Sequence, residues 1–102
     1  MVRISGSDAE KLLGNVPSEY MFRCCDGSIF SNVVELRDGL MTMSDDSYAF
    51  HAGQGRSDFN NWERDIIRDK KLARDLLKSS NRVQAARSVT ARISFLSSKL
   101  GQ

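Results

Sequence analysis

The sequence is poor in the residues that build disulfide frameworks, metal centres and membrane spans. Its 102 residues include one proline, one histidine and two cysteines. No apolar stretch approaches the roughly 18 residues that a membrane-spanning helix needs. The N-terminal segment also lacks the apolar core of a secretion signal. These absences predict a cytoplasmic protein that has no membrane partner.

The two cysteines, Cys24 and Cys25, are neighbours in the sequence. A disulfide favours Cα atoms farther apart than one peptide unit comfortably allows, so we expect free thiols on a buried strand. The alternative, Cys25 as a reactive thiol, stays open. A zinc site needs about four ligands, and His51 is the one histidine. The sequence therefore predicts no metal site and no cofactor.

Charge is small overall and unevenly divided. The net charge is +2, but residues 1–52 hold four basic and eight acidic side chains, whereas residues 53–102 hold eleven and five. The last acidic residue is Asp75, and the later cations include Arg82, Arg87, Arg92 and Lys99. Such an excess is typical of a solvated helix face, since cations favour helix C-termini. The alternative is a surface for nucleic acid or an acidic partner.

Local patterns in the first third predict a short helix and a hairpin. Ser7 and Glu10 have the spacing of a capping box, which predicts a helix over 9–13 that stops at Gly14. Asp26-Gly27 lies between two apolar stretches, and glycine accepts the positive φ of a tight turn. We therefore expect a small β-hairpin near residues 20–31.

Periodic apolar positions predict helices through the rest of the chain. We expect helix starts at Asn32, Ser44, Ser57 or Asp58, Asp69 and about Arg82. Three apolar stripes have helical spacing: Val33, Leu36, Leu40 and Met43; Phe59, Trp62 and Ile66; and Ala86, Val89, Ile93, Leu96 and Leu100. The sequence predicts one mostly α domain over residues 1–102, with five to six short helices and a minor β component.

The apolar face of the last helix, predicted from Arg82 to Lys99, has two interpretations. Its stripe is too short for a coiled coil, so we expect it to face the core of its own domain. Helix-mediated dimerisation is the alternative, and the chain is expected to be a monomer or a weak homodimer.

Between residues 20 and 75 the chain contains Phe22, Asp26-Gly27, Leu36, Leu40, Met43-Ser44-Asp45, Tyr48-Ala49-Phe50-His51, Asp58-Phe59, Trp62 and Leu72-Ala73. Together these runs resemble a prokaryotic family of small domains that has no established activity. The resemblance covers about half of the chain and picks out His51, Asp58, Phe59 and Trp62 as a signature. This chain departs from the family pattern at Ser57, Phe50 and Arg68, where the family tends to have Asn, Tyr and Gly.

No catalytic set assembles from the sequence, so we expect a non-enzymatic module that binds a protein partner. Its candidate surface is the signature together with Tyr48, or else the last helix. The alternative is a nucleic-acid-binding module in which Arg82, Arg87, Arg92 and Lys99 contact phosphates. An enzyme centred on His51 is a third reading. We expect His51 to be structural and to bond to Asp58 across the glycine turn.

Overall fold

The computed structural model describes residues 3–53 and 55–100 and has a mostly α architecture with one two-stranded hairpin. The elements, in chain order, are α1 (Gly6–Leu13), a 3₁₀ turn (Ser18–Tyr20), β1 (Phe22–Arg23), β2 (Ile29–Phe30), α2 (Val33–Thr42), α3 (Asp45–Ala52), α4 (Asp58–Trp62), a π-helix (Glu63–Ile67), α5 (Lys70–Lys78) and α6 (Arg82–Ser97). The predicted fold class is confirmed. No helix within the described ranges is long and apolar enough to cross a membrane.

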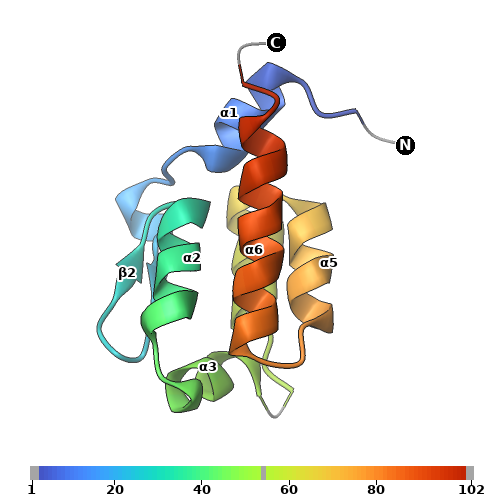
Figure 1. Ribbon diagram of the computed structural model, residues 1–102. Helices are drawn as coiled ribbons and strands as arrows, with labels where there is room; N and C mark the ends of the chain where they lie inside the picture. Colours follow the sequence, from blue (N-terminus) through green and yellow to red (C-terminus); the bar gives the residue numbers. More distant parts are fainter. Residues whose placement is uncertain (1–2, 54, 101–102) are drawn as a thin grey trace.

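The longest helix, α6, organises the molecule. It packs against α2, α5 and α1, and it stands between α2 and α5 in Figure 1. The hairpin packs on α2, and α3 lies at the end of the molecule opposite α1. The buried apolar side chains form one cluster, which includes Phe22, Phe30, Leu36, Leu40, Phe59, Trp62, Leu72, Leu76, Ala85, Val89 and Ile93.

Side-chain caps fix most helix starts where the sequence predicts them. Asn32, Ser44 and Asp69 each accept a hydrogen bond from the backbone N–H three residues later. The first helix differs from the prediction. Its capping box is formed by Ser5 and Asp8, two residues before the predicted pair, and the helix therefore begins at Gly6.

The predicted hairpin is confirmed, with Phe22 paired to Phe30 and Arg23 paired to Ile29 in antiparallel register. Gly27 has a φ of +93°. The cysteines follow β1 and do not lie on it. Cys24 is buried as expected, but Cys25 is exposed because it begins the turn. The expectation that both thiols are buried is therefore half right.

Two of the three apolar stripes shift from their predicted positions. The α2 stripe is buried as predicted, but in α6 the buried small residue is Ala85 where we expected Ala86, and Leu100 is exposed beyond the end of the helix. The π-helix widens one turn after Trp62, so Ile67 is buried in the core and Ile66 is only partly buried. The sequence reasoning assumed a regular α-helical period there.

Candidate functional site

An aromatic cluster around Phe22 joins the hairpin to the helices. The Phe22 ring lies 5.1 Å from His51, 5.0 Å from Phe59 and 5.9 Å from Trp62, measured between ring centroids. Tyr48 of α3 stacks on Phe59 at 5.7 Å. The structure therefore brings four of the five predicted surface residues into one cluster. Three of them, His51, Phe59 and Trp62, are buried, and Tyr48 is partly exposed.

His51 bridges the hairpin and α4 through both of its ring nitrogens. Its Nε2 accepts the backbone N–H of Cys25 at 3.0 Å, and its Nδ1 lies 2.9 Å from Oδ2 of Asp58. Because an amide N–H can only donate, Nε2 must be the unprotonated nitrogen of a neutral ring, and Nδ1–H then donates to Asp58. The predicted contact between His51 and Asp58 is confirmed. A base in this state has no free lone pair for a substrate.

Asp58 accepts a second hydrogen bond on the same oxygen. Nη2 of Arg56 donates to Oδ2 of Asp58 at 2.7 Å, and the Arg56 guanidinium lies 4.3 Å from the centre of the exposed Phe50 ring. Trp62 binds the chain just before β1, because its Nε1–H donates to the carbonyl of Tyr20 at 2.8 Å. The signature residues are therefore joined to the hairpin by ring contacts and polar bonds.

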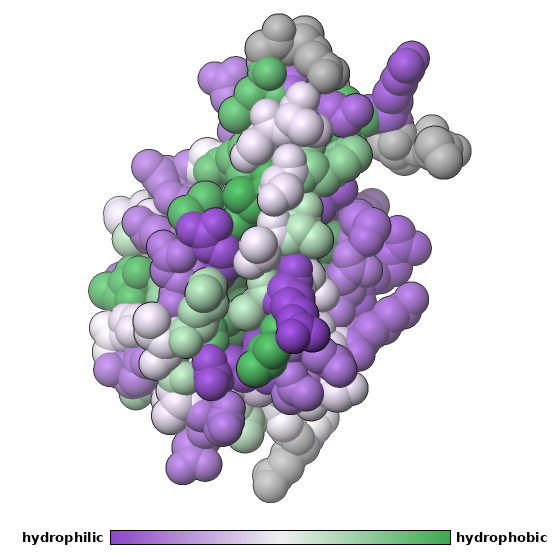
Figure 2. Space-filling model, viewed as in Figure 1, coloured by the Kyte–Doolittle hydropathy of each residue, from purple (hydrophilic) through white to green (hydrophobic). Residues whose placement is uncertain are grey.

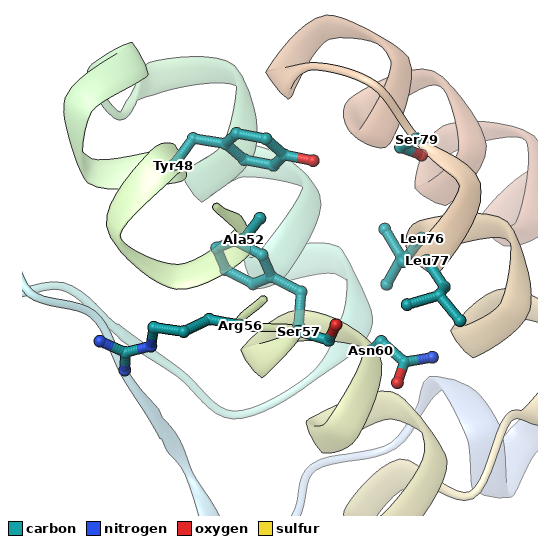
Figure 3. Close-up of a pocket in the computed structure, with 9 residues that line it drawn as sticks. Tyr48, Ala52, Arg56, Ser57, Asn60, Leu76, Leu77 and Ser79 are labelled. Atoms are coloured by element: carbon teal, nitrogen blue, oxygen red, sulfur yellow. The ribbon is translucent and has the colours of Figure 1, made fainter. Parts of the chain in front are cut away.

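A small cavity lies between α3, α4 and α5 (Figure 3). Tyr48 lies on one side of it, Leu76 and Leu77 on the other, and Asn60 below. Its volume is about 40 Å³, which has room for water but not for a metabolite. Burial raises the pKa of the Tyr48 hydroxyl, which keeps this wall uncharged near neutral pH.

The four predicted phosphate-contacting residues have different surroundings. Arg92 forms a two-bonded ion pair with Asp69, and Arg82 binds Asp45 as well as the carbonyls of Leu40 and Met41 at the end of α2. Arg82 and Arg92 therefore have acidic partners, although no acidic residue follows Asp75 in the sequence. Lys99 lies over the Phe95 ring.

Arg87 differs from those three cations. It is exposed, and it forms no ion pair or hydrogen bond with the described part of the chain. Arg87 is therefore free to meet an external acidic group.

An apolar groove lies between the end of α2 and the first half of α6. It is lined by Met41, Arg82, Val83, Ala86, Arg87, Thr90 and Ala91, with a volume of about 590 Å³. Met41 is 61% exposed and Val83 50% exposed. Figure 2 shows green and pale side chains over this side of α2 and α6, with purple side chains around them. Sequence reasoning selected the last helix but not Met41, because only the fold places Met41 next to α6.

The structure also gathers two groups that the sequence did not reveal. Cys24, Cys25 and His51 bring their sulfur and nitrogen atoms within 4.8 Å of one another. Glu63 is fully buried beside Asp69 and Arg92, and neither of its carboxylate oxygens has a hydrogen-bond partner among the described residues. Burial and the Asp69 charge raise the pKa of Glu63 to about 8, although Arg92 lowers it. The signal for this buried group in the sequence is that Glu63 lies within an apolar helical pattern.

In comparisons of sequence and structure, no protein-family model, curated protein or solved structure matches this chain. The resemblance to a prokaryotic family of small domains therefore stays a prediction.

Proposed function

We propose that this chain is a non-enzymatic interaction module that binds an amphipathic, acidic helix of a protein partner in the groove between α2 and α6. The observation that carries the proposal is the exposure of both Met41 and Val83 in the lining of that groove. Large apolar side chains that share a groove with polar rims are typical of surfaces that receive the apolar face of a helix.

The charge around the groove selects an acidic partner. Arg82 and Arg87 both line it, and Arg87 is free of intramolecular partners among the described residues. α6 has no acidic residue, and the two acids that line pockets with Arg87, Asp75 and Asp45, are paired with Lys71 and Arg82. A carboxylate of the partner can therefore pair with Arg87 while apolar side chains cover Met41 and Val83.

The alternative functions have less support. A phosphate-binding face that uses Arg82 and Arg92 would have to break their ion pairs with Asp45 and Asp69. An enzyme centred on His51 would need the nitrogen that accepts the Cys25 amide. The aromatic signature serves the proposed module as a frame, because its rings hold the hairpin against the helices.

A display library of helix-forming peptides tests the proposal directly. We expect enrichment of peptides with apolar residues at positions i, i+3 or i+4 and i+7 and with acidic residues beside them. Enrichment should disappear in Val83→Glu and fall sharply in Arg87→Glu. The matched control is Leu77→Glu, because Leu77 is 60% exposed on α5 and lies outside the groove. Peptides that bind Val83→Glu as tightly as wild type would contradict the proposal.

The nucleic-acid alternative is tested in parallel with labelled DNA and RNA, single- and double-stranded, at about 50 and 200 mM salt. Phosphate-driven binding falls by orders of magnitude over this range. Arg87→Ala is the informative variant, because Arg92→Ala also removes a buried ion pair. Strong binding that depends on salt and on Arg87 would replace the protein-binding proposal with the nucleic-acid one.

A further inference from the structure

We propose that Cys24, Cys25 and His51 form a binding site for a thiophilic divalent cation of the zinc and cadmium class. Their candidate ligand atoms, two sulfurs and one ring nitrogen, all lie within 4.8 Å of one another. Two thiolates and an imidazole are a donor set that such ions prefer. This site shares no residue with the groove between α2 and α6. The metal-binding proposal is therefore independent of the proposed function.

The turn of the hairpin explains how two adjacent cysteines can face the same point. Side chains of neighbouring residues on a strand point to opposite faces. Here the strand ends at Arg23, and the Gly27 amide bonds back to the Cys24 carbonyl, which closes a turn over residues 24–27. Because Cys25 lies inside the turn, the alternation stops, and both sulfurs approach His51.

Asp58 supplies the acceptor that metal-binding histidines usually have on the nitrogen that does not bind the metal. Nδ1 of His51 donates to the Asp58 carboxylate, so Nε2 is the nitrogen with a lone pair, and it faces the hairpin turn. A carboxylate on the far nitrogen fixes the tautomer and orients the ring of a metal ligand. Arg56 donates to the same Asp58 oxygen and helps to hold the carboxylate in place.

Binding requires a small rearrangement with a balanced exchange of protons. Ligand atoms around a four-coordinate zinc lie about 3.3 to 3.8 Å apart, so the three atoms must close by about 1 Å. The Cys25 N–H must also leave Nε2 of His51. Each thiol loses its proton, and two protons are released for each divalent ion bound. Cys25 is exposed, so water can occupy a fourth position.

The test is a titration of the reduced protein with Cd²⁺, and then with Zn²⁺, in the presence of a phosphine reductant. We expect a thiolate-to-cadmium absorption band that saturates at one equivalent. The chain has a single histidine, so its imidazole ¹⁵N signals can be assigned without ambiguity. We expect the Nε2 signal to move in step with the absorption band.

Variants test each part of the site, and Asp58→Asn separates the complete site from simple chelation by two thiols, because the cysteine variants weaken binding in either case. Cys24→Ser and Cys25→Ser should each weaken binding by more than about 100-fold, and Asp58→Asn by about 10- to 100-fold. Glu19→Gln, an exposed acid outside the cluster, should bind as wild type does. Cys25 is exposed, so the serine variant there is the one best able to keep the fold.

Two results would overturn the proposal. One is the absence of the absorption band at one equivalent of Cd²⁺ in the folded wild-type protein. The other is a band that saturates while the His51 signals stay in place, because two vicinal thiols would then bind the ion without the histidine.

Discussion

Arg92 of α6 and Asp69, 23 residues earlier, form a nearly buried ion pair with two hydrogen bonds. Nε and Nη2 of Arg92 donate to the two Asp69 oxygens at 2.8 and 3.0 Å, and the side chains are 10% and 2% exposed. Asp69 also accepts the Leu72 amide at the start of α5. This pair therefore ties α6 to the N-terminus of α5. Both of its charges lie close enough to the buried Glu63 to affect the pKa of that carboxyl group.

Removing one partner of this pair should destabilise the fold strongly. We expect Arg92→Ala to lower the free energy of unfolding by about 3 to 5 kcal/mol, because it leaves Asp69 buried without a counter-charge. Arg87→Ala on the same helix is the matched control and should change it by less than about 0.5 kcal/mol. Urea unfolding followed by circular dichroism measures both variants. Equal effects of the two variants would contradict a structural role for the pair.

Glu63 should make the stability of the protein fall as the pH rises. Its pKa is about 8 in the folded chain and about 4.5 in the unfolded one, so between these values the folded state holds a proton that the unfolded state has lost. The contribution of Glu63 to the free energy of unfolding is complete below pH 4.5. It then falls by about 1.4 kcal/mol per pH unit until the pH reaches about 8. Asp69 and Arg92 are the charged groups beside Glu63.

The variant that isolates this contribution is Glu63→Gln. We expect the free energy of unfolding of Glu63→Gln, relative to wild type, to rise steadily between pH 5 and 8, because glutamine cannot ionise. The exposed Glu19→Gln should follow the wild-type curve in urea unfolding at each pH. A constant difference between Glu63→Gln and wild type across this range would exclude an ionisable buried Glu63.

Gly39 in the middle of α2 allows Phe30 to lie against the helix. A Cβ at this position would overlap the end of the buried Phe30 ring. Glycine-to-alanine changes in helices usually add about 1 kcal/mol of stability, but here we expect Gly39→Ala to destabilise by about 1 to 2 kcal/mol, because overpacking outweighs helix propensity. Thermal unfolding measures the change. In a Phe30→Leu background the same substitution should cost less, and an equal cost would show that Phe30 is not the cause.

Arg68 adopts a left-handed conformation that glycine accepts without strain. Its φ is +72° and its ψ +32° at the end of the π-helix, and its side chain is exposed. We expect Arg68→Gly to raise the free energy of unfolding by about 0.5 to 1 kcal/mol, since the strain of an L-residue there exceeds the entropy cost of glycine. Arg68→Ala keeps the strain and should bring no gain.

Short-range patterns were sufficient to predict many of the local elements. The caps at Asn32, Ser44 and Asp69, the Asp-Gly turn and the buried stripe of α2 follow from residues within four positions of one another. The bond between His51 and Asp58 was also predictable, because a short turn separates them. Capping, turn formation and amphipathic spacing are local effects, so the sequence encodes them directly.

Tertiary structure decided the features on which both proposals depend. The contact of Cys25 with His51 spans 26 residues, and the pairing of Arg82 with Asp45 spans 37. The π-helix shifted the stripe from Ile66 to Ile67, and packing buried Ala85 where spacing had selected Ala86. Long-range contacts depend on how whole helices pack, which no local spacing fixes. The sequence alone therefore determined which segments are helices, whereas the packing of α6 against α2 and α5 decided which cations are paired and which apolar side chains stay exposed.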